Sequence, residues 1–205
     1  DMLNGPLFFK ILVFALPLAA SSLLQQLFNS VDVAVVGRFA SSKALAAVGS
    51  NAPVISLLIN LFVGISMGAN VVISNHLGQR DDESTRRAVS TVSLVAIISG
   101  FVLMCLGIGV SRPILEMMDT PADVLDMAVL YLRIYFIGIP FFLIFNFGAA
   151  ILRSVGDTRR PLYILVAAGI VNTLLNLFFV ICLGMGVEGV AIATAIANVL
   201  SAASI

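Results

Sequence analysis

Long uncharged stretches separated by short charged segments dominate the pattern of hydrophobic and polar positions along the chain. Charged side chains bound six such stretches, which cover residues 11–31, 44–79, 88–111, 134–152, 161–187 and 189–205. A helix needs about 20 largely apolar residues to cross the hydrocarbon core of a bilayer. No stretch alternates apolar and polar residues over the roughly ten positions of a transmembrane β-strand. The pattern therefore predicts an all-α, polytopic membrane protein with six transmembrane helices.

The expected helices follow these stretches and extend into their polar ends. We place them approximately at residues 7–37, 44–77, 86–111, 123–153, 160–184 and 188–205, in one transmembrane domain that covers residues 1–205. The last stretch reaches Ile205 without a flanking charge or a cap. We therefore expect the sixth helix to be truncated and interpret the chain as a fragment.

Composition narrows the classes of function. Of the 205 residues 60% are hydrophobic and 11% are charged, whereas about 25% of the residues in a soluble domain are charged. The net charge is zero, so no basic patch indicates a nucleic-acid partner. The signatures of nucleotide-binding loops, serine hydrolases and zinc peptidases are all missing from the sequence. We therefore expect neither an enzyme nor a cofactor, and an ion gradient remains as the energy source.

Basic residues in the connecting segments predict the orientation. One side of the membrane carries seven of them, Lys10, Arg80, Arg86, Arg87, Arg153, Arg159 and Arg160, and the other side carries Arg38, Lys43 and Arg112. The excess of Lys and Arg on cytoplasmic loops predicts a cytoplasmic N-terminus in a multi-pass protein of the plasma membrane. Arg133 is expected to reach the outer interface. His76 is interpreted as an interfacial residue of the second helix.

A polar stripe runs along the first helix to its one carboxylate. Spacings of three and four residues place Ser21, Gln25, Asn29 and Asp32 on one face. An intramembrane carboxylate is by default a functional hypothesis, because it can exchange a proton or bind sodium beside amide oxygens. The alternative is an interfacial Asp32 that is hydrogen-bonded to Ser30 or Arg38.

Other helices carry similar polar positions. They are Asn146 in the fourth helix, Asn172 and Asn176 in the fifth, and Thr194 and Asn198 in the sixth. Each could be an interhelical hydrogen-bonding residue, but their recurrence on several helices favours a shared hydrated cavity around Asp32. Pro17 interrupts the hydrogen bonding of the first helix and is a candidate hinge for closing that cavity.

Several motifs together resemble a known family of transporters. They are Leu16-Pro17, Val31-Asp32, Gly37-Arg38, Gly78-Gln79-Arg80-Asp81, Leu152-Arg153-Ser154-Val155-Gly156-Asp157-Thr158-Arg159-Arg160-Pro161, Asn172 with Asn176, and Met185-Gly186-Val187-Glu188-Gly189-Val190-Ala191-Ile192-Ala193-Thr194. With these motifs the chain resembles, nearly end to end, the N-terminal half of a bacterial multidrug and toxic compound extrusion (MATE) transporter.

The resemblance implies one six-helix lobe of a twelve-helix antiporter that exports amphipathic, often cationic, drugs in exchange for protons or sodium. It implies a cation site at Asp32, Asn172, Asn176 and Thr194, and a substrate cavity that includes Gln25, Phe28, Asn29, Asn146 and Asn198. Asn176 stands where some members carry a second acidic residue. The implied partners are small-molecule drugs, membrane lipids and the missing C-terminal lobe. The alternatives are a lipid-linked oligosaccharide flippase of the same superfamily and a non-transporting membrane scaffold.

Overall fold

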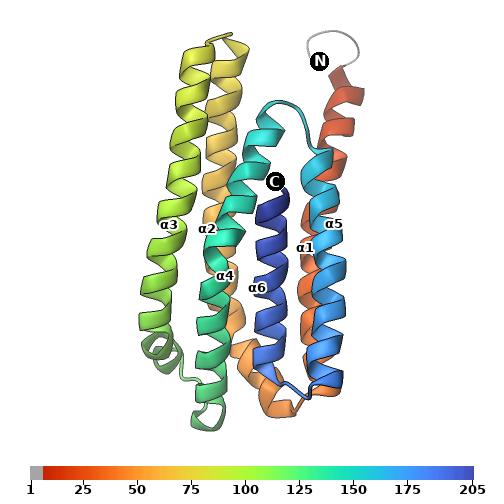
Figure 1. Ribbon diagram of the computed structural model, residues 1–205, viewed down its shortest axis with the longest axis vertical. Helices are drawn as coiled ribbons and strands as arrows, with labels where there is room; N and C mark the ends of the chain where they lie inside the picture. Colours follow the sequence, from red (N-terminus) through yellow and green to blue (C-terminus); the bar gives the residue numbers. More distant parts are fainter. Residues whose placement is uncertain (1–6) are drawn as a thin grey trace.

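A bundle of six long helices makes up the computed structural model of the protein (Figure 1), which describes the backbone of residues 7–205. Side chains are described from residue 12 onward, so the side chain of Lys10 lies outside the described residues. The helices are α1 (Leu7–Phe39), α2 (Ser42–Gly78), α3 (Asp82–Met117), α4 (Ala122–Ser154), α5 (Arg159–Leu177) and α6 (Val187–Ser204), with a π-helical turn η1 (Phe178–Cys182) after α5. In this described part, all six helices are long and apolar enough to cross a membrane, which confirms the expected fold class.

Helix α3 is longer at both ends than the predicted range of residues 86–111. It begins at Asp82 because the Asp81 carboxylate accepts a hydrogen bond from the backbone N–H of Ser84 at 3.0 Å. It continues to Met117 through Pro113. The charge of Arg112 marked the predicted end, but this side chain pairs with Glu116 one turn further along the same helix.

Helix α5 ends before the predicted boundary at residue 184. Its last turn widens into η1, and the N–H of Leu183 donates to the Phe178 carbonyl at 3.2 Å. Gly184 follows with a φ of 65°, a left-handed conformation that glycine adopts without steric cost. The chain then reverses and enters α6.

Helix α4 is the centre of the packing. It contacts α2, α3 and α6, and most of its circumference is buried. Glycines allow α3 to come close: a Cβ on Gly100 would lie 2.7 Å from the Cα of Pro140. Helices α1 and α5 pack side by side on the far side of α6 (Figure 1). The interior between α1, α5 and α6 is therefore bounded on the α4 side by closely packed helices.

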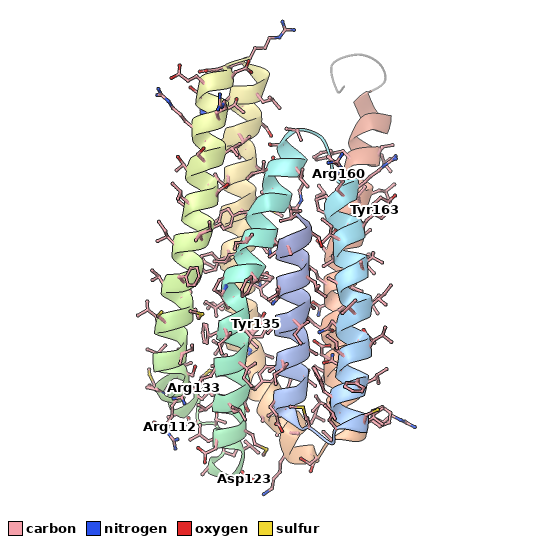
Figure 2. The ribbon with its side chains drawn as sticks, in the orientation of Figure 1. Arg112, Asp123, Arg133, Tyr135, Arg160 and Tyr163 are labelled. Atoms are coloured by element: carbon pink, nitrogen blue, oxygen red, sulfur yellow. The ribbon has the colours of Figure 1, made fainter. Side chains whose placement is uncertain are left out.

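Charged and apolar side chains separate as they do in a membrane protein. Large apolar residues such as Leu23, Leu57 and Ile98 are exposed on the sides of the bundle, where lipid would contact them. At one end Arg112 pairs with Asp126 at 3.1 Å and Lys43 with Asp123 at 3.7 Å. Figure 2 shows Arg133 at this same end and Arg160 at the opposite one.

Candidate functional site

Asp32 is the one charged residue that is buried among the described side chains, with 8% of its surface exposed. It projects from α1 toward α5 and α6. The Asn176 amide donates a hydrogen bond to its Oδ1, and the Thr194 hydroxyl lies 3.4 Å from its Oδ2. Ser30 donates instead to the Gln26 carbonyl of its own helix. Asp32 is thus held by two other helices, which argues against the alternative of a merely interfacial carboxylate.

Asn172 completes a closed polar cluster of four residues with Asp32, Asn176 and Thr194. Its Oδ1 accepts from the Asn176 amide at 3.3 Å, and its own amide donates to the Thr194 hydroxyl at 3.3 Å. Thr194 has a single hydroxyl proton, and the Val190 carbonyl, at 3.0 Å, competes with Asp32 for it. The structure therefore brings together all four residues that were expected to form the cation site.

One acceptor in this cluster has no partner. The Oδ1 of Asn176 is buried and makes no hydrogen bond within the described part of the chain, although buried polar atoms are nearly always satisfied. The Asp32 carboxylate, the Thr194 hydroxyl and the Asn176 amide oxygen give this cluster hard oxygen donors. Such a set fits a sodium ion, and the carboxylate alone fits a proton.

A cavity of about 330 Å³ opens beside the cluster, with Asp32, Asn172 and Thr194 in its wall. Four of the predicted substrate residues also line it: Gln25, Phe28, Asn29 and Asn198. The Phe28 ring lies against Gly169 of α5, where a Cβ would be only 2.0 Å from the ring. Glycine at this position therefore makes room for an aromatic wall.

Asn146 and Pro17 lie away from the cavity wall. Asn146 is buried and donates to the Phe142 carbonyl of its own helix at 2.9 Å, and it is not among the residues that line the cavity. This corrects the expectation that it lines the cavity. Pro17 lies within a continuous α1, and its carbonyl accepts from the Ser21 hydroxyl at 2.8 Å. The proposed hinge is thus one turn from the polar stripe rather than within the site.

Five polar residues in the cavity wall were not predicted: Ser22 and Gln26 of α1, Asn60 of α2, Tyr135 of α4 and Ser201 of α6. Asn60 lies in the middle of its apolar stretch, nine residues after Asn51 and ten before Asn70, and this central position is a signal that could have found it. No such signal marks Tyr135, because a tyrosine in a membrane helix is expected to lie at the membrane–water interface. Figure 2 shows Tyr135 about midway along the bundle, at the depth of the cavity rather than at a membrane surface.

These features define a class: a polytopic helical membrane protein in which one buried carboxylate with amide and hydroxyl neighbours faces an internal cavity. The MatE family model matches residues 17–178, and the chain belongs to this family. The family comprises transporters rather than enzymes.

Individual relatives agree with this assignment. The chain is 32% identical over 193 residues to the probable multidrug resistance protein YoeA of Bacillus subtilis, covering 91% of this chain and 41% of YoeA. It is 29% identical over 206 residues to the probable multidrug resistance protein NorM of Thermotoga maritima, covering 94% and 42%. The chain thus spans less than half the length of these relatives.

Solved structures give the same picture. A crystal structure of MATE in the bent conformation superimposes with a TM-score of 0.90 at 26% identity, covering 95% of this chain and 43% of that one. An outward-facing conformation of a multidrug resistance MATE family transporter of the MOP superfamily gives a TM-score of 0.88, also at 26% identity, with the same coverage. The six helices correspond to one lobe of these transporters.

Proposed function

We propose that this chain is the N-terminal lobe of a secondary multidrug antiporter, which exports amphipathic or cationic compounds in exchange for protons or sodium ions. The observation that carries the proposal is Asp32, buried in the wall of a 330 Å³ cavity and contacted by Asn176 and Thr194. The relatives named as multidrug resistance proteins support the substrate class.

The proposed mechanism is competition between the cationic compound and the coupling ion for the negative charge of Asp32. A cationic compound in the cavity is attracted to Asp32, and a proton or sodium ion bound there removes that attraction. Aromatic walls at Phe28 and Tyr135 offer apolar contact, whereas Gln25 and Asn198 offer hydrogen bonds without fixing one ligand shape. Loading of Asp32 from the outer side would thus release the compound, with Pro17 as the hinge that lets α1 move.

A second lobe would complete the binding site. A cavity of 330 Å³ is at the lower end of the roughly 300–1,000 Å³ range of ligand sites. In a twelve-helix transporter the facing lobe would enlarge and close it. We therefore propose the C-terminal lobe as the structural partner of this chain, with drugs and membrane lipids as its other contacts.

The cavity wall disfavours the flippase alternative. A lipid-linked pyrophosphate needs cationic partners, but neither Lys nor Arg is among the described residues that line the cavity. Arg133 is exposed at the end of the bundle that also carries Arg112 (Figure 2). A scaffold without transport activity would have no need for a polar cavity around a buried carboxylate.

The proposed orientation places the N-terminus in the cytoplasm of a plasma-membrane protein. The α2–α3 and α4–α5 connections, together with the helix ends next to them, carry six of the basic residues and lie at one end of the bundle (Figure 1). Single cysteines at Gln79 and at Thr120, in connections at opposite ends, test this in whole cells. We expect a membrane-impermeant maleimide to label only the cysteine at Thr120, and labelling of Gln79Cys instead would invert the topology.

Asp32→Asn in the full-length transporter tests the function. Asparagine keeps the shape of the side chain but not its charge, so ion-driven dye efflux should be lost at normal membrane levels. Asp123→Asn, which removes an exposed carboxylate at the end of α4, is the matched control and should transport normally. Efflux driven by separate pH and sodium gradients identifies the ion. Unchanged efflux in Asp32→Asn would refute the coupling role.

A further inference from the structure

A second cavity, of about 350 Å³, lies between α2 and α3 near the connection of the two helices. Ala69, Val72 and His76 form its wall on α2, and spacings of three and four residues place them on one helical face. Ser84, Ala88 and Thr91 form the opposite wall on α3 with the same spacing. This α2–α3 groove shares none of its lining residues with the cavity at Asp32.

Polarity changes along the α2–α3 groove. Toward the middle of the bundle its walls carry Ala69, Val72, Ala88 and Val92, and the hydroxyl of Thr91 donates to the Arg87 carbonyl of its own helix. Toward the connection they carry His76, Ser84 and Arg87. Figure 1 shows this connection projecting beyond the neighbouring ends of α4 and α5. In a bilayer the apolar part of the groove would face the hydrocarbon core and its polar end would face the headgroups.

The polar end of the groove has unused hydrogen-bonding capacity. The Nδ1 of His76 is buried and has no hydrogen-bond partner among the described residues, which calls for an explanation. Arg87 is exposed and pairs only with Glu83, itself exposed, at 2.5 Å. Exposed ion pairs contribute little to stability, so another anion can take the place of Glu83 without a large loss.

We propose that the α2–α3 groove binds a membrane phospholipid, with the phosphate at Arg87 beside His76 and an acyl chain along the apolar part. A phosphodiester is negatively charged in every phospholipid and accepts several hydrogen bonds, which complements a guanidinium and an imidazole. The change from apolar to polar walls along the groove matches the change from acyl chain to headgroup along a phospholipid. The proposal depends on neither transport nor the orientation in the membrane, because both leaflets contain phospholipid.

Native mass spectrometry of the full-length transporter tests this site with two lipids that share acyl chains. Phosphatidylglycerol carries a phosphate and monoglucosyl-diacylglycerol does not. Arg87→Gln should weaken the binding of phosphatidylglycerol by about tenfold or more, the usual scale for a charged hydrogen-bonding partner. The matched control is Arg86→Gln, which removes the same charge from the next residue, outside the groove, and should bind as the wild type does.

A second pair of variants tests the apolar part. Val72→Trp should fill the groove and displace the lipid, whereas Val71→Trp places the same ring on the neighbouring, more exposed position outside the groove. Thermal unfolding of both variants shows whether they are folded. If Arg86→Gln and Arg87→Gln lose lipid equally, or if both lipids bind equally well, the phosphate site is refuted. Displacement by inorganic phosphate would show an aqueous anion site instead, and self-association lost only in Val72→Trp would show a second copy of the chain in the groove.

Discussion

The Asn176 amide of α5 donates a hydrogen bond to the Asp32 carboxylate of α1, and both side chains are buried. The two residues are 144 positions apart in the chain, yet each is part of the polar pattern of its own helix. Because Asn176 also donates to Asn172, the amide joins the carboxylate to the rest of the polar cluster. A change in the charge of the Asp32 carboxylate can therefore alter the packing of α1 against α5.

Asn176→Leu should therefore destabilise the transporter by more than the loss of a single hydrogen bond between uncharged groups would. Removal of a donor to a buried carboxylate costs about 1.5–3 kcal/mol, and leucine also lacks the amide oxygen that Asn176 contributes to the cluster. We expect lower thermal stability and ion-driven efflux reduced at least several-fold. Both are measured on purified protein and in proteoliposomes.

Asn146→Leu is the control for that prediction, because Asn146 is also buried but bonds only to its own helix. We expect it to lose no more than about 1 kcal/mol of stability and to retain efflux. If Asn146→Leu abolished efflux while Asn176→Leu did not, the assignment of the site would be reversed.

Close contact between α3 and α4 leads to a second prediction. A Cβ at Gly100 would lie 2.7 Å from the backbone of Pro140, which cannot move aside as a side-chain tip can. Gly100→Ala should therefore push the helices apart and cost about 1–3 kcal/mol. In the same helix, a Cβ at Gly109 meets nothing within 4 Å, so Gly109→Ala should leave the melting temperature unchanged or raise it. Equal melting temperatures for the two variants would contradict the close approach.

The six membrane spans and most of the site could be predicted because lipid penalises charge and unpaired polar groups so strongly. Asp32, Asn172, Asn176 and Thr194 stand out from apolar surroundings, and the fold brings all four together. The sequence could not predict whether the side chain of Asn146 points into the cavity. Since α4 is buried around most of its circumference, its sequence has no polar face to indicate which side meets the cavity.

The groove between α2 and α3 could not be predicted from the sequence either. Its apolar residues, such as Val72 and Ala88, are of the kind that also line helix interfaces and lipid-facing surfaces. Only the packing of two helices leaves the Nδ1 of His76 buried without a partner. Helix ends were missed for a related reason, because a charged residue such as Arg112 can lie inside a helix when its head reaches the interface.

The N-terminus of α3 should depend on pH. The hydroxyl and the backbone N–H of Ser84 hold the pKa of Asp81 below its usual value of 3.8. Because the folded carboxyl has the lower pKa, the stability gained from the cap is present above about pH 4 and is lost as the pH falls through the lowered pKa. Hydrogen exchange at Ser84 and Thr85, corrected for intrinsic rates, should therefore accelerate in acid.

Two variants separate this cap from general acid effects. Asp81→Asn keeps an acceptor for the Ser84 N–H but does not titrate, so the pH dependence should vanish while protection persists. Asp82→Asn removes the neighbouring carboxylate, which is not the cap, and should leave the dependence in place. An unchanged profile in Asp81→Asn would assign the effect to another group.

Pro17→Ala tests whether α1 bends during transport. Proline has no N–H to donate to the carbonyl of Val13, and alanine restores that hydrogen bond. We expect Pro17→Ala to stiffen α1 and to reduce efflux several-fold at unchanged expression. Spin labels at Leu16 and Tyr163, both exposed, should show a narrower distribution of α1–α5 distances. Pro53→Ala makes the same change inside α2, which lines a different wall of the cavity, and should transport normally. Equal efflux and equal distance distributions in the two variants would show that Pro17 is only a packing residue.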